Sequence, residues 1–319
     1  MTETTAPPLL SARHVGKQYE RHTAVSDVSF DIPAGSIFGL LGPNGAGKTS
    51  IIRIITQITA PDTGEVFFKG ERLSPSHIGR IGYLPEERGL YKKMKVGEQL
   101  VYLARLKGLP KDEAVRRINR WLDKLDFKGQ AHKNVEDLSK GMQQKVQFIA
   151  TVLHEPELLI LDEPFSGFDP INANLIKDEI LELRRRGTTI IFSTHRMESV
   201  EELCDHIALI NRARKILDGP VKEVRNSFRT STFEVMGTSP APPILAHPDF
   251  HVVEQEKMAE DHFRLTVQLL NGVPLNTLLR FLIEKTPAQI HAVHELIPSI
   301  NDIFIRTVRE NEAAAIPTT

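Results

Sequence analysis

The sequence has only one cysteine, Cys204, among its 319 residues. A single cysteine excludes an internal disulfide and a multi-cysteine metal site, and it favours a reducing, cytosolic setting. An excess of charge of either sign is also missing, because 40 Lys and Arg stand against 41 Asp and Glu, giving a formal charge of −1. Nucleic-acid binders usually carry a visible basic excess, so this balance argues against a nucleic-acid partner.

Long hydrophobic runs are missing as well. No stretch approaches the ~18 uninterrupted apolar residues that span a bilayer, and the richest candidate, residues 51–58, is interrupted by Arg53. The N-terminal segment MTETTAPPLL has neither the basic start nor the long apolar core of a secretory signal. If the protein serves a membrane process, we expect another chain to cross the membrane.

The first two-thirds of the chain alternates short apolar runs with helix-period segments, which predicts an α/β domain with a mainly parallel sheet. The runs SIFGLL (36–41), LLILD (158–162) and IIFS (190–193) are continuously apolar, as expected of buried strands. From about Val96 to Leu125 the apolar residues recur at helical spacing instead. We therefore expect a helical subdomain, over about 92–155, inserted into the α/β core.

The character of the sequence changes after Gly219. Residues 263–269 alternate between apolar and polar, which predicts a half-exposed strand, and a helix with one apolar face follows, marked by Leu275, Leu278, Leu279, Leu282 and Ile283. We expect a small α+β domain over 228–310 and a flexible tail over 311–319.

Residues 42–49, GPNGAGKT, match the phosphate-binding motif G-x-x-x-x-G-K-[ST] and follow the apolar run SIFGLL, as the motif requires. Glycines let backbone N–H groups converge on phosphate oxygens. Lys48 supplies positive charge to the β- and γ-phosphates, and Thr49 offers a hydroxyl to Mg²⁺. A chance match is expected in only about one chain in a hundred of this length.

Polar residues follow the two later apolar runs. Asp162 and Glu163 lie at the end of LLILD, where an aspartate of a P-loop protein holds Mg²⁺ and an adjacent glutamate can act as general base. By strand alternation, we expect Glu163 to point away from the Asp162 side. His195 follows IIFS, on a strand that we expect beside the Asp162 strand, from which it can reach a γ-phosphate.

The segment Leu138-Ser-Lys-Gly-Met-Gln-Gln-Lys resembles the LSGGQ signature of ATP-binding cassette proteins. The other motifs of that family occur in family order: Tyr19 where an aromatic stacks on adenine, the Walker A loop, Asp162 of Walker B, the D-loop Ser166–Asp169 and the switch His195. The resemblance covers about residues 9–225. It implies a P-loop ATPase cassette with an inserted helical subdomain.

The resemblance implies roles residue by residue. It implies that Lys48, Glu163 and His195 are catalytic. It also implies that Thr49 and Asp162 bind Mg²⁺. Contacts with ATP fall to Tyr19, Gly42, Pro43, Asn44, Gly45, Ala46, Gly47, Lys48, Thr49, Ser50, Ser139 and Gly141. Ser139 and Gly141 would act on the ATP of a second cassette, so that two copies enclose two nucleotides.

Two positions depart from the family pattern. Lys140 and Met142 replace a glycine and a glutamine of the signature, although the phosphate-facing Ser139 and Gly141 remain. Glu86 stands where the family has the Q-loop glutamine. A carboxylate can bind Mg²⁺ but cannot donate as an amide does, so Glu86 is either a third metal ligand or stands back from the phosphates.

We therefore expect an ATP-hydrolysing subunit of a membrane transporter, peripheral on the cytoplasmic face, with a separate permease and no nucleic-acid partner. GYLPEERGLY (82–91) and PSINDIFI (298–305) resemble exporter ATPases of the sodium-efflux type and their small accessory domain. A soluble cassette protein of translation or DNA repair and a non-catalytic nucleotide-binding regulator are the alternatives. Translation factors of that type carry two cassettes and repair members a long coiled coil, and a regulator would lack Glu163 or His195. The sequence does not identify the transported substrate.

Overall fold

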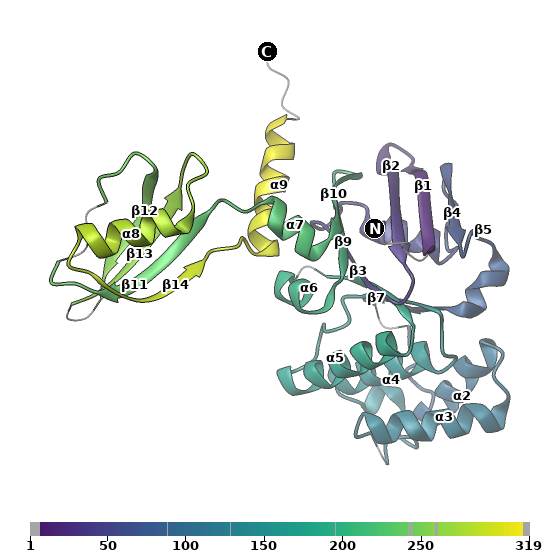
Figure 1. The fold of residues 1–319 in the computed structure, drawn as a ribbon. Coiled ribbons are helices and arrows are strands. Elements are labelled where there is room, and N and C mark those ends of the chain that lie inside the picture. The colour runs from purple at the N-terminus through teal and green to yellow at the C-terminus, as the bar shows by residue number, and fades with distance from the viewer. Residues whose placement is uncertain are drawn as a thin grey trace. The chain divides into compact units, whose positions relative to one another are not determined.

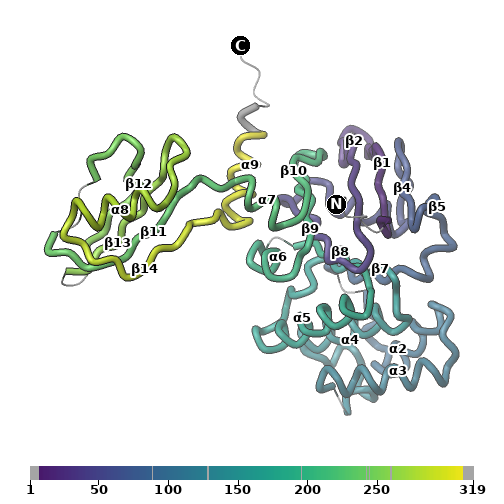
Figure 2. The backbone as a smooth tube through the Cα atoms, in the orientation of Figure 1, coloured from purple at the N-terminus to yellow at the C-terminus, as the bar shows by residue number. Residues whose placement is uncertain are grey.

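The computed structural model describes residues 7–87, 89–127, 129–194, 196–241, 243, 245–258 and 261–314. The backbone divides into two compact units (Figures 1 and 2). The first unit contains the chain up to Val221 and again from Arg306 onward, and the second contains Lys222–Ile305. Each unit has its own hydrophobic core.

The central sheet of the first unit contains six strands, which lie in the spatial order β10 (Arg214–Pro220), β9 (His206–Asn211), β3 (Ile37–Leu41), β8 (Thr189–Ser193), β7 (Leu158–Asp162) and β6 (Ile81–Leu84). All neighbours are parallel except β10 with β9. β3, β7 and β8 are buried along their whole length, as expected of parallel strands covered on both faces. The carboxyl ends of β3, β8 and β7 therefore meet at one edge of the sheet.

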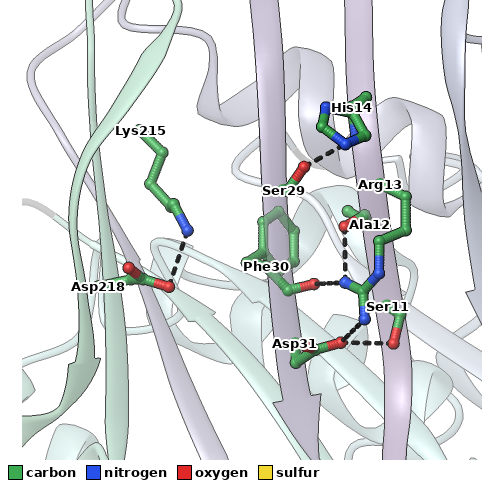
Figure 3. A network of polar contacts seen from close by, with 9 residues as sticks. All are labelled: Ser11, Ala12, Arg13, His14, Ser29, Phe30, Asp31, Lys215 and Asp218. Carbon is green, nitrogen blue, oxygen red and sulfur yellow. Dashed lines mark hydrogen bonds and ion pairs between the residues drawn. The ribbon is translucent and has the colours of Figure 1, made fainter.

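A second sheet in this unit is antiparallel, in the order β2 (His22–Pro33), β1 (Pro8–Tyr19), β4 (Thr63–Phe68) and β5 (Glu71–Arg72). Across the β1–β2 pair, Asp31 accepts hydrogen bonds from the Ser11 hydroxyl and the Arg13 guanidinium, both at 2.6 Å (Figure 3). Partial burial raises the pKa of the Asp31 carboxyl, but these bonds and the Arg13 charge outweigh it and the pKa is lowered. The network ties the outer strand pair of this sheet together.

The helices α1 (Lys48–Ile55), α5 (Pro170–Arg185) and α6 (Met197–Leu203) follow strands β3, β7 and β8 along the chain, giving the β–α order predicted for an α/β domain. A 3₁₀ segment, η1 (Pro75–Arg80), precedes β6. α1 buries four isoleucines in the core shared with the antiparallel sheet: Ile51, Ile52, Ile54 and Ile55. This packing holds α1 against the core, so that it begins at the end of the loop that follows β3.

The predicted helical subdomain consists of α2 (Val96–Leu106), α3 (Lys111–Lys124), the 3₁₀ turn η2 (Val135–Asp137) and α4 (Lys140–Val152). All three helices contact one another. Ile118 and Leu122 are buried on α3, as their spacing predicts, whereas Val115 is exposed. The apolar face of α3 is thus narrower than the sequence pattern indicates.

The second unit has an antiparallel sheet in the order β12 (Phe250–Lys257), β13 (His262–Leu269), β11 (Thr232–Thr238) and β14 (Gln289–Glu295), with helices α7 (Val221–Ser227), α8 (Leu275–Lys285) and α9 (Ile300–Ala314). Leu278 and Leu282 of α8 are buried, as predicted, but Ile283 is 66% exposed. Ile283 follows Leu282 by one residue, about 100° around the helix, which turns it out of the core. α9 continues past residue 305, so its last turns belong to the first unit.

The structure confirms the predicted fold class: an α/β cassette with an inserted helical subdomain and an α+β C-terminal domain. Within the described residues, none of the helices combines the length and apolar character that crossing a bilayer requires.

Candidate functional site

The phosphate-binding loop runs from the end of β3 to the start of α1, as its sequence predicts. Gly42 has φ 149°, and a Cβ built on it would lie 2.2 Å from the Ile210 carbonyl oxygen. Gly47, the residue before α1, has φ 114° and would place a Cβ 2.2 Å from the Ala24 carbonyl oxygen. Both positions therefore require glycine. Between and after them lie the other expected ATP contacts, Pro43, Asn44, Gly45 and Ala46 in the loop and Thr49 and Ser50 in the first turn of α1.

The Lys48 ammonium lies over this loop. It donates to the carbonyl oxygens of Gly42 at 2.7 Å and Pro43 at 3.1 Å. Burial lowers the pKa of Lys48, and the carboxylates of Asp162, Glu163 and Glu86 oppose that shift without cancelling it. An ammonium has three donors, so two hold the loop and the third is available to a phosphate oxygen.

Asp162 ends strand β7, two strands from β3, and its side chain is buried. Burial raises the pKa of its carboxyl, as do the charges of Glu86 and Glu163, while Lys48 lowers it; the net direction is upward. Glu86 comes from the exposed segment after β6, the strand next to β7. The structure therefore brings Asp162, Glu163 and Glu86 within electrostatic range of Lys48.

The charges of these three carboxylates act on one ammonium, that of Lys48. Among the residues that the structure describes, no group of three or more His, Cys, Asp or Glu side chains could hold a metal ion by itself. Mg²⁺ sites of nucleotide-binding proteins commonly use one or two carboxylates together with substrate phosphates and waters.

Glu163 lies just beyond β7, and its φ of 49° is left-handed. The direction of the Glu163 side chain is therefore set by the turn after β7. It is not set by strand alternation, as the sequence analysis assumed. The Thr194 hydroxyl donates to Glu163 Oε2 at 3.2 Å, and the Glu163 backbone N–H donates to the Ser193 carbonyl at 2.9 Å. These bonds link the ends of β7 and β8, which pair as expected. His195, the predicted γ-phosphate sensor, lies outside the described residues.

The signature residues lie at the start of α4. Ser139 is its N-cap, and the Ser139 hydroxyl accepts a hydrogen bond from the Met142 N–H at 3.3 Å. A Cβ built on Gly141 would contact the Gly167 carbonyl oxygen at 3.5 Å and the Phe168 ring at 3.6 Å. Signature and D-loop of one chain therefore pack together. A helix N-terminus of this kind favours anions, which fits the expected phosphate contact.

Tyr19 ends β1, and its ring is exposed, as an adenine-stacking aromatic must be. The Lys17 ammonium is 5.4 Å from the ring centroid. Asp62, which the sequence analysis did not single out, accepts from Lys17 Nζ and from the Gln18 N–H, both at 2.7 Å, and its own N–H donates to the Gly16 carbonyl at 2.8 Å. Asp62 therefore holds the segment directly before Tyr19, a long-range contact that no local motif signals.

Comparisons with known proteins identify the family of the chain. Residues 25–166 match the family described as ABC transporter, and residues 219–308 match the family described as ATP-binding protein DrrA1-3-like, C-terminal domain. A solved structure, described as the structure of the ATP binding subunit of an ABC transporter, has a TM-score of 0.65 and 30% identity, covering 69% of this chain and 93% of its own.

Curated relatives extend over most of the chain. An uncharacterized ABC transporter ATP-binding protein, YhaQ of Bacillus subtilis (strain 168), is 42% identical over 94% of this chain and 98% of its own length. The Nod factor export ATP-binding protein I of Cupriavidus metallidurans is 35% identical, over 69% and 73%. The linearmycin resistance ATP-binding protein LnrL of Bacillus subtilis is 35% identical, over 66% and 69%. The chain therefore belongs to the ABC transporter ATP-binding proteins, the ATPase subunits whose hydrolysis of ATP drives transport.

Proposed function

We propose that this ABC ATPase energises an exporter: two copies act together on the cytoplasmic face of a membrane, beside a separate permease. One observation carries the proposal. The phosphate-binding loop after β3 and the acidic end of β7 flank the polar end of β8 at one sheet edge, with Lys48 in the field of Asp162 and Glu163. Such an arrangement binds a nucleoside triphosphate and cleaves its terminal phosphate.

Each residue has a defined task in that reaction. Lys48 neutralises the β- and γ-phosphates, and the loop N–H groups orient them. Thr49 and Asp162, with Glu86 nearby, would hold Mg²⁺, which would offset phosphate charge. Glu163 accepts a proton from the attacking water, with its carboxylate held by Thr194. We assign the γ-phosphate contact to His195.

The cassette pair follows from the signature. Ser139 and Gly141 open α4, and Gly141 is packed against the D-loop. We propose that this surface closes on the γ-phosphate of a second copy, so that ATP stabilises the closed pair and hydrolysis releases it. Tyr19 would stack on the adenine of its own chain's ATP.

The direction of transport is proposed from the relatives. One is a Nod factor export protein and another a linearmycin resistance protein. The second unit resembles the C-terminal domain of DrrA1-3-like proteins. The Nod factor relative is named for export, and the proposal extends that direction to this chain. The sodium-efflux type that GYLPEERGLY suggests is one form of this proposal.

The permease would dock on the helical subdomain. A groove of about 500 Å³ lies between α2, α4 and the segment around β6, with an apolar lining that includes Tyr83, Leu90, Leu103 and Ala150. Leu106, which also lines the groove, is 66% exposed. Such a groove fits the apolar face of an amphipathic permease helix. Lys92, Lys93 and Lys95 are exposed on the adjoining segment, where an anionic leaflet would attract them.

The catalytic part of the proposal is tested with Glu163→Gln. The amide keeps the shape but cannot accept the proton, so phosphate release should fall by about 10²–10⁴-fold while ATP affinity is retained. Size-exclusion chromatography with ATP and Mg²⁺ should show the trapped pair. Glu284→Gln, an exposed change on α8, is the matched control. Normal turnover by Glu163→Gln would contradict the assigned base.

The transport direction needs the complete transporter. The protein, purified with its permease and reconstituted into vesicles with the ATPase facing outward, should accumulate substrate only when ATP is added outside. Candidate cations, drugs and lipids would be screened by their stimulation of phosphate release. ATP-driven loss of substrate from such vesicles would show import and overturn the export proposal.

A further inference from the structure

The hairpin between β9 and β10 has a strained turn. Asn211 pairs with Arg214, which leaves Arg212 and Ala213 as a two-residue loop. Both residues have positive φ, 46° and 66°. Hairpins of this length usually place Asn-Gly or Gly-Gly there, because a Cβ disfavours the left-handed region. A turn without glycine keeps this conformation only when neighbouring contacts hold it.

Those contacts are made to the phosphate-binding loop and to strand β2. The Ala213 N–H donates to the Ala46 carbonyl at 3.0 Å, and the Ala213 carbonyl accepts from the Ser26 N–H at 2.7 Å. The Ile210 carbonyl oxygen is the atom that a Cβ on Gly42 would strike at 2.2 Å. The β9–β10 hairpin therefore contacts the phosphate-binding loop at both Gly42 and Ala46. A shift of its turn would displace Ala46 through the hydrogen bond from Ala213.

The first residue of this hairpin is held from the far end of the chain. Asn211 is 3% exposed, and its Nδ2 donates to Asn311 Oδ1 at 3.2 Å. Asn311 lies in the last turns of α9, in the part of the helix that belongs to the first unit. A buried amide that loses its acceptor costs free energy, so the bond favours the hairpin position seen here.

We propose that Asn311 is a positioning residue for nucleotide binding: through Asn211 it fixes the strained β9–β10 hairpin, and the hairpin fixes the Walker A loop in its phosphate-binding form. The C-terminal helix thereby sets the affinity of the cassette for ATP. This inference rests on the proposed function of the Walker A loop. It assigns a role in the ATPase cycle to the end of α9, more than 260 residues along the chain from the loop that it supports.

The test measures ATP binding by the full-length protein. Asn311→Ala removes the acceptor, and the dissociation constant for ATP with Mg²⁺, measured by titration calorimetry, should rise about three- to tenfold, the effect of one lost hydrogen bond. KM should rise in parallel, with kcat within about twofold. Asn311→Asp keeps the acceptor oxygen and should restore parental affinity. The double variant, which carries both Asn211→Ala and Asn311→Ala, should bind ATP no more weakly than the weaker-binding of the two single variants, because both changes break the same bond.

Asn301→Ala, an exposed asparagine on the first turn of the same helix, is the matched control and should leave affinity unchanged. Thermal unfolding is recorded for every variant. Parental ATP affinity in Asn311→Ala overturns the inference, and so does a lower melting temperature without a change in affinity. Lys48→Ala separates the two proposals: if it abolishes binding while Asn311→Ala does not weaken it, only this inference fails. If Lys48→Ala still binds ATP, the proposed Walker A function fails.

Discussion

The six-stranded central sheet of the first unit and the antiparallel sheet of the second unit place their polar residues differently. In the first unit β3, β7 and β8 are buried at every position, so their chemistry is confined to the ends of the strands. In the second unit, charged residues lie along the strands, and Arg264 on β13 bridges Glu234 on β11 and Glu256 on β12. A parallel sheet covered on both faces gathers reactive groups at one edge, whereas an antiparallel sheet with one open face uses them to pair its own strands.

Two glycines give the sharpest test of this difference. A Cβ on Gly42 and a Cβ on Gly237 would each lie 2.2 Å from a carbonyl oxygen, that of Ile210 and that of Gln289. Gly42→Ala should reduce ATP affinity by at least a hundredfold, because the loop has to leave its phosphate-binding form. Gly237→Ala should destabilise the β11–β14 pairing and leave ATP affinity unchanged. Calorimetric titration with ATP measures the first effect.

The chain has only one tryptophan, and Trp121 lies on α3 in the first unit. Its fluorescence therefore reports unfolding of that unit, while far-ultraviolet circular dichroism reports both. Gly237→Ala should lower the temperature of a circular-dichroism transition without moving the Trp121 transition. Equal loss of ATP affinity in the two variants would mean that the units are not separate in function.

Much of the cassette could be predicted because its determinants are local. The strands at 158–162 and 190–193 are continuously apolar, and the loop at 42–49 needs glycine at Gly42 and Gly47 for reasons of backbone geometry. The N-cap role of Ser139 likewise follows from its own helix. Such features depend on neighbours within a few residues, so the sequence alone is enough to locate them.

The features that escaped prediction depend on long-range contacts or on the geometry of a single residue. Asp62 holds Lys17 across 45 residues and Gln18 across 44, and Asn311 reaches Asn211 across 100. Neither pair has a spacing that a local pattern reveals. Strand alternation failed as a guide to the direction of Glu163 for another reason: strand β7 ends at Asp162, and the backbone of Glu163 itself is left-handed, so alternation does not apply to it.

A substitution of Asp62 tests whether the antiparallel sheet of the first unit contributes to ATP binding. Asp62→Ala removes the bonds to Lys17 and Gln18, so Tyr19 loses its fixed position. We expect KM for ATP to rise about three- to tenfold with kcat within about twofold, because stacking contributes to binding and not to phosphate cleavage. Steady-state phosphate release measures both. Asp31→Ala, which breaks the network in Figure 3 on the same sheet, is the control and should leave KM unchanged.

The smallest expected effect concerns two ion-pair networks of opposite arrangement. In the first unit, Glu157 lies between two cations: Arg80 Nε donates to it at 2.5 Å, and Lys69 also pairs with it. These bonds outweigh partial burial and lower the pKa of Glu157 from 4.5 to about 2. In the second unit, Arg264 lies between two carboxylates instead, one of them Glu256.

A carboxyl whose pKa is lowered by folding stabilises the folded state when it is ionised. Its contribution is therefore complete above about pH 4.5, falls as the pH drops below 4.5, and is lost by about pH 2. Solvent screens this partly exposed group, so Glu157→Gln should cost about 1 kcal/mol at pH 7, or about 2–4 °C in the Trp121 transition. The difference from the parent should shrink as the pH is lowered below 4.5. Glu256→Gln should change little at any pH, because Arg264 keeps Glu234. A Glu157→Gln difference that is constant with pH would show that the network contributes packing and not charge.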